Sequence, residues 1–140
     1  MMQLITDRTY SDVLLKTEKG CYGVADLNRV EQAVAELVDI AKALGVQDDF
    51  EIKLDWELPG AFSPAQWPTT AQMHRYLDNV YRLCQAVELA TELPVSMETL
   101  TWEGANQIEK ALELVYTRIQ SILQVLRFSG EIFAGEENYI

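Results

Sequence analysis

The sequence predicts a mainly α-helical fold: three principal helices in a bundle, a short N-terminal helix and a small β element. Three segments predict the bundle, because each places apolar residues at alternating steps of three and four; they span about 26–44, 69–90 and 102–127. Apolar and charged residues alternate strictly over 50–58, which predicts the β element. A chain of 140 residues that is 49% apolar can bury a core as one domain.

The first two helices are indicated by their end signals. Thr9 is a natural N-cap for the short N-terminal helix, with Asp12 three residues later in its first turn. The first long helix has Asp26 as a candidate N-cap and Gly45 as a candidate residue just past its C-terminus. Its apolar face consists of Leu27, Val30, Val34, Leu37, Ala41 and Leu44.

The alternating segment 50–58 is the one convincing strand pattern in the sequence, with apolar positions at Phe50, Ile52, Leu54, Trp56 and Leu58. A lone strand leaves backbone groups unpaired, so it needs a partner. The candidates are the C-terminal tail, the N-terminal segment and another chain.

The remaining helices follow a proline-rich loop. Thr69 or Thr70 opens the second long helix, which reaches about Ala90, and the third runs from about Trp102 to Arg127. Its seam keeps a regular seven-residue repeat, as helical bundles require: Ala105, Ile108, Leu112, Val115, Ile119, Ile122 and Leu126. We therefore expect one helical domain over 1–127. Glycines and aromatic residues in the tail, 128–140, predict an extended arm, which is a candidate to pair with the strand at 50–58 or with a strand of a neighbouring subunit.

One motif occurs twice. LNRVEQA at 27–33 and ANQIEKA at 105–111 share an Asn followed three residues later by a Glu, namely Asn28 with Glu31 and Asn106 with Glu109. A short amide near a helix start can bond a neighbouring backbone. We interpret the pairs as structural, fixing the register at a helix–helix boundary; a ligand-binding pair and chance are the alternatives.

Charge and cysteine content exclude several classes of function. The net charge is −11 and the pI about 4.4, which argues against nucleic-acid binding and against electrostatic membrane attachment. No apolar run approaches the length of a membrane span. Cys21 and Cys84 lie far apart, so they form no metal-binding cluster, and we expect a protein made in a reducing cytoplasm.

Catalytic signatures are missing from the sequence. His74 is the single histidine, and the motifs GxSxG, ExxH, GxxxxGK[ST] and GxGxxG do not occur. We expect no catalytic residue, no cofactor and no bound metal, and we interpret the acids at 48–55 as a solvated strand face. The side chains best suited to contact a partner are aromatic ones in the loop and the tail: Trp67, Phe128, Phe133 and Tyr139.

The order of motifs resembles a family of structural proteins, associated with tails or virions, that phages and prophages of Gram-positive bacteria carry. The motifs are ITDRTYSDV, ADLNRVEQAV, KLDWE, PTTAQMHRYLDNV, LTWEGANQIEKAL and the closing FSGEIFAGE, and they cover nearly the whole chain. The resemblance implies a protein that acts in assembly, and it brings no active-site residues with it.

These observations together predict a non-catalytic phage or prophage structural protein that acts through protein–protein contacts. Its expected partners are copies of itself or other phage structural proteins. Its expected location is the bacterial cytoplasm during synthesis and the virion afterwards. The alternative is a small acidic regulator or DNA mimic that binds a host DNA-binding protein. Acidic side chains along one face would favour that alternative, whereas here they are interleaved with Lys and Arg.

Overall fold

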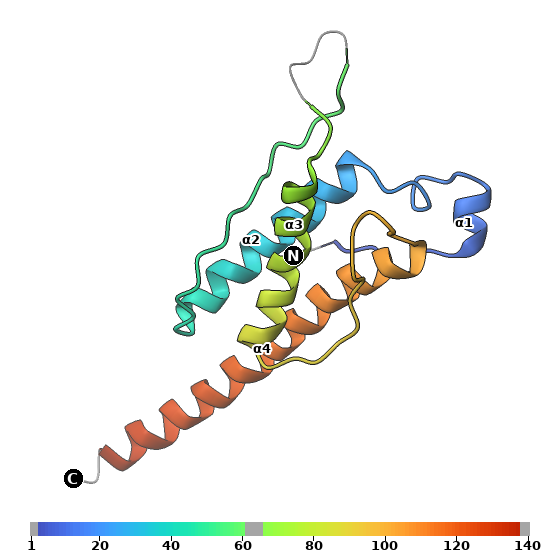
Figure 1. Cartoon of the computed structure of the whole chain (residues 1–140). Helices are drawn as coiled ribbons and strands as arrows, with labels where there is room; N and C mark the ends of the chain where they lie inside the picture. The colour runs from blue at the N-terminus through green and yellow to red at the C-terminus, as the bar shows by residue number, and fades with distance from the viewer. Residues whose placement is uncertain (1–2, 61–65, 138–140) are drawn as a thin grey trace.

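Four helices form the fold of the described residues. The computed structural model describes residues 3–60 and 66–137, and for 127–137 it describes the backbone alone. The helices are α1 (Tyr10–Leu14), α2 (Val24–Ala43), α3 (Thr70–Ala86) and α4 (Trp102–Glu137) (Figure 1). The predicted mainly α fold, with three principal helices and a short N-terminal one, is confirmed.

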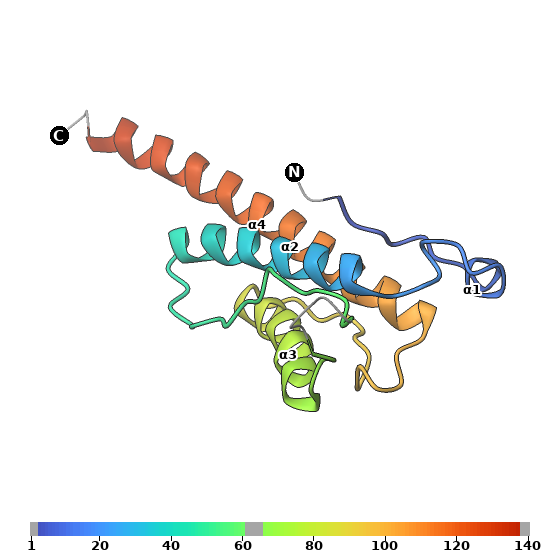
Figure 2. The same ribbon diagram turned by 90° about the horizontal axis from the view of Figure 1, so that it is seen from above.

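The three long helices pack against one another in every pairing. α2 and α4 lie side by side and run in the same direction, and α3 crosses them on one face (Figure 2). The core is formed by the apolar faces of all three helices, and its hydrophobic residues with no more than 1% of their surface exposed are Val30, Leu37, Ala41, Tyr76, Val80, Leu83, Ile108, Ala111, Leu112, Val115 and Ile119.

The helix ends follow simple capping chemistry. Thr9 caps α1 and Thr69 caps α3, each in a capping box with the residue three positions later. The prediction that Asp26 is the N-cap of α2 is wrong, because Gly23 is the N-cap and Asp26 occupies the third helical position. From there its carboxylate accepts a hydrogen bond from the Gly23 N–H at 2.8 Å.

The predicted strand at 50–58 is not formed, since no described residue of this segment belongs to a strand. The segment instead runs as extended chain along α2 and α3 (Figure 1). Side chains of the helices satisfy its backbone: Arg82 donates to the Asp49 carbonyl at 2.7 Å, and Asn79 and Arg75 donate to the Glu51 carbonyl at 2.8 and 2.7 Å. Helical side chains thus replace the partner strand that the alternating pattern predicts.

The prediction of an extended tail from residue 128 is also wrong, because α4 continues as helix to Glu137. The last part of α4 projects beyond the ends of α2 and α3 (Figures 1 and 2). Two glycines, Gly130 and Gly135, disfavour helix by only about 1 kcal/mol each relative to alanine, so they do not break it.

Candidate functional site

The first Asn–Glu pair, near the start of α2, holds the extended segment at one residue. The side-chain amide of Asn28 donates to the Trp56 carbonyl and accepts from the Trp56 N–H, both at 2.9 Å. The Glu31 carboxylate, one turn later on the same face, accepts from the indole N–H of Trp56. The pair therefore binds the main chain and the side chain of the same residue.

The second pair repeats this arrangement on α4 with the N-terminal segment. Asn106 accepts from the Arg8 N–H and donates to the Arg8 carbonyl, both at 3.0 Å. Glu109 accepts from the Arg8 guanidinium at 2.6 Å and from the Ile5 N–H at 3.1 Å. We call the two pairs, Asn28 with Glu31 and Asn106 with Glu109, the N-x-x-E clamps.

The clamps differ from the register device that the sequence predicts. Each Asn bonds an extended segment that crosses its helix, rather than a neighbouring helix. The repetition of Asn and Glu is visible in the sequence, but their partners, Trp56 and Arg8, are not. No local pattern marks them, because each partner lies far from its clamp along the chain.

Ion pairs tie the clamps to each other and to α3. Arg29 on α2 donates to Glu109 on α4 at 2.7 Å, and Arg8 also contacts Asp26 at 3.0 Å. The two guanidinium groups of Arg8 and Arg29 thus balance the two carboxylates of Asp26 and Glu109. The hydrogen bond to Glu109 is the chief cause that raises the pKa of Arg29 above its usual range. The Arg29 guanidinium therefore stays protonated.

The clamp on α2 has a matching cation. Arg75 on α3 donates from both terminal guanidinium nitrogens, Nη1 and Nη2, to the Glu31 carboxylate, and this hydrogen bonding is the main cause that raises the pKa of Arg75. Beside these ion pairs, the hydroxyls of Tyr22 and Tyr76 share a short hydrogen bond. Burial raises the pKa of both tyrosines well above the ordinary value.

These buried polar groups are used in holding the fold together. Within the described part of the chain, every buried side-chain nitrogen or oxygen has a hydrogen-bond partner. The same residues include no group of three or more side chains that could hold a metal ion. None of the helices in that part is both long enough and apolar enough to cross a membrane.

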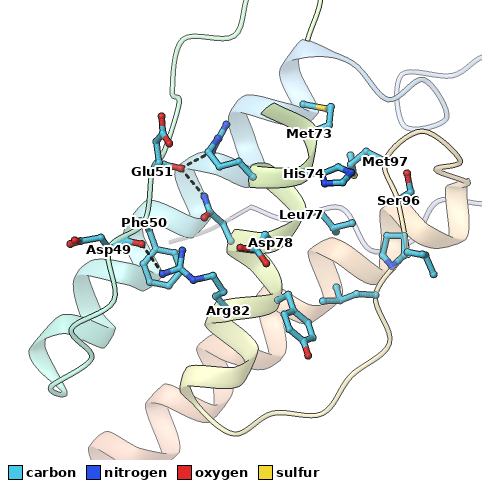
Figure 3. Close-up of a pocket in the computed structure, with 16 residues that line it drawn as sticks. Asp49, Phe50, Glu51, Met73, His74, Leu77, Asp78, Arg82, Ser96 and Met97 are labelled. Carbon is cyan, nitrogen blue, oxygen red and sulfur yellow. Dashed lines mark hydrogen bonds between the residues drawn. The ribbon is translucent and has the colours of Figure 1, made fainter. Parts of the chain in front are cut away.

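A hollow beside α3 has a volume of about 880 Å³ (Figure 3). Its basic groups already have partners in the fold: Arg75 pairs with Glu31, and Arg82 stacks on the Phe50 ring at 4.4 Å. His74 stands exposed at the rim. The hollow presents a mixed apolar and polar surface, and its apolar lining comprises Phe50, Met73, Leu77, Tyr81, Leu93, Pro94, Val95 and Met97.

Of the aromatic residues proposed as partner contacts, the structure describes the side chain of Trp67 alone. It is 72% exposed and lies at a second cavity, of about 380 Å³, which Tyr22 and Trp56 also line. The side chains of Phe128 and Phe133 and the whole of Tyr139 lie outside the described residues.

The projecting part of α4 carries a surface that the sequence pattern predicts as core. Ile119 is fully buried, but farther along the helix Leu123 is 37%, Val125 64% and Leu126 54% exposed. The regular seam predicts burial as far as Leu126; Ile122 is half-buried, and at Leu126 that prediction is wrong. The seam continues in the sequence, whereas the helices that cover it end sooner.

Comparison with known proteins returned no similarity: no family model, no curated protein and no solved structure matches this chain.

Proposed function

We propose that this chain is a non-catalytic structural or assembly protein of a phage or prophage particle, which acts through protein–protein contacts. The observation that carries the proposal is the projecting end of α4, where Leu123, Val125 and Leu126 are open to solvent. Apolar side chains grouped on one uncovered helix are typical of a protein-binding surface.

The motifs behind the resemblance to phage structural proteins support the same proposal. ITDRT contains Arg8, LNRVE contains Asn28 and Glu31, and KLDWE contains Trp56. ANQIEK contains Asn106 and Glu109, so these motifs supply both N-x-x-E clamps and the residues that they hold. Their chemistry is architectural, which is what an assembly protein requires.

Mass spectrometry of purified particles tests this function. Particles released from the bacterium that carries the gene are banded on a density gradient, and their proteins are quantified against the cleared lysate. We expect the chain to be enriched in the particle fraction together with the other virion proteins, while an abundant cytoplasmic enzyme is not. A chain that stays entirely in the lysate would overturn the proposal.

A further inference from the structure

The uncovered part of α4 continues the face that packs inside the bundle. When Ile108, Glu109, Ala111 and Leu112 are shifted by two heptads, they fall on the apolar set Ile122, Leu123, Val125 and Leu126. The first set is fully buried, in the part of α4 that packs against both α2 and α3. In the second set Ile122 is half-buried, whereas Leu123, Val125 and Leu126 are exposed, and the end of α4 projects beyond α2 and α3 (Figure 2). The apolar face is therefore as wide as the one that two neighbouring helices cover farther back, and the described residues of this chain leave most of it open.

The helix beyond Leu126 also needs packing partners to be stable. Helices without tertiary packing are marginal in water, because most helical stability in proteins comes from packing of an apolar face. Gly130 and Gly135 weaken this part further, by about 1 kcal/mol each. A helix that nevertheless runs to Glu137 fits a segment stabilised by other helices.

Charge indicates which partner fits. The chain carries a net charge of −11, so two copies repel each other over most of their surface. No Asp or Glu occurs on α4 between Glu113 and Glu131, and the same stretch contains Arg118 and Arg127. A basic partner would find no acidic group there to pair with, whereas another copy of this chain meets an apolar face without repulsion between acids.

We propose that residues 122–126 of α4, which follow the last core residue Ile119, are the surface through which at least three copies of this chain associate, side by side and in parallel. The seam supports this number, since Leu at its first position with Ile at its second, as in Leu126 and Ile122, favours bundles of three or four strands over pairs. Helices that lie along one rotation axis run in the same direction in every copy. The inference rests on the proposed function, and it names another copy of this chain as the first partner in assembly.

Sedimentation equilibrium of the purified full chain, over a concentration series, tests the inference. We expect a mass at least three times the chain mass of 15.9 kDa. Leu126→Glu places a charge in the seam and should reduce the mass to that of one chain. Gln124→Glu adds the same charge two residues away, at an exposed position outside the repeat, and should leave the assembly intact. Thermal melts followed by circular dichroism serve as the control that both variants fold.

Two results would overturn the inference. One is a wild-type chain that sediments as a monomer or dimer at every concentration. The other is dissociation of the Gln124→Glu variant as complete as that of Leu126→Glu, which would mean that added charge, and not the lost apolar contact, separates the chains. The particle experiment is independent of both: a chain found in particles but monomeric when purified would remove this inference and leave the proposed function standing.

Discussion

At the scale of single residues, Glu109 connects three parts of the molecule: α4, the N-terminal segment and α2. Its side chain is fully buried and accepts hydrogen bonds from the N-terminal segment through Ile5 and Arg8, and from α2 through Arg29. A buried carboxylate is tolerated because these donors compensate for its lost hydration. The same donors depend on it, since the Arg8 side chain is only 2% exposed.

Replacing Glu109 by alanine should therefore cost about 3–5 kcal/mol in the free energy of unfolding, because the buried Arg8 loses a carboxylate partner. Urea unfolding at neutral pH measures the change. Glu113→Ala is the matched control: it removes the same side chain one turn later, where the ion pair with Lys110 is exposed to solvent and is worth no more than about 1 kcal/mol. Similar losses for the two variants would contradict the role assigned to the clamp.

At the scale of elements, α4 combines two environments in one helix. Up to Ile119 its seam is part of the core, and beyond that residue the seam passes from half-buried Ile122 to exposed Leu126. A repeat in the sequence predicts which side of a helix is apolar, but it does not predict how far neighbouring helices extend. The structural half and the associating half of α4 can therefore be tested separately.

Ile119→Ala should destabilise the monomer by about 2–5 kcal/mol, because it leaves a cavity where the side chain is fully buried. The comparison is best made by urea unfolding in the Leu126→Glu background, so that association does not add to stability. Lys110→Ala, on the exposed side of the same helix, should cost less than about 0.5 kcal/mol. Small and equal losses at the two positions would mean that the seam has been placed on the wrong face.

At the scale of the whole molecule, buried groups that carry a proton in the folded state should make the protein less stable as the pH rises into the alkaline range. Burial raises the pKa of Tyr22 and of Tyr76 well above the ordinary value near 10, and it raises the pKa of the Cys84 thiol to about 11. In the unfolded chain these groups lose their protons first, so above their ordinary pKa values the unfolded state binds fewer protons than the folded state. Their contribution is complete below those values and is lost as the pH rises through the higher, folded-state pKa values.

The urea midpoint should accordingly be lower at about pH 11 than at about pH 8. The double variant Tyr22→Phe, Tyr76→Phe keeps both rings but removes both titrating hydroxyls, so its midpoint should fall less between the two pH values. Absorbance of tyrosinate gives a second readout, since these two hydroxyls should ionise only when the protein unfolds. A midpoint that stays constant across this range, or an equal fall in the double variant, would contradict the prediction.

Much of the fold could be predicted from the sequence, because helices are local structures. Apolar spacing placed the three long helices, and the capping residues Thr9 and Thr69 marked two of the helix starts. The repeated Asn and Glu are likewise visible in the sequence itself, as is the apolar character of α4 as far as Leu126. Each of these features depends on residues within a few positions of one another.

The tertiary structure alone decided which partners these residues have. The alternating segment 50–58 could not reveal that helical side chains, Arg75 and Asn79 among them, would occupy its backbone groups in place of a strand. Nor could the sequence pair Asn106 with Arg8, 98 residues away. Such contacts depend on how three helices are oriented in space, and so does the point at which α2 and α3 stop covering α4. Spacing along the chain carries no record of that orientation, which is why the surface proposed for association emerged only from the folded molecule.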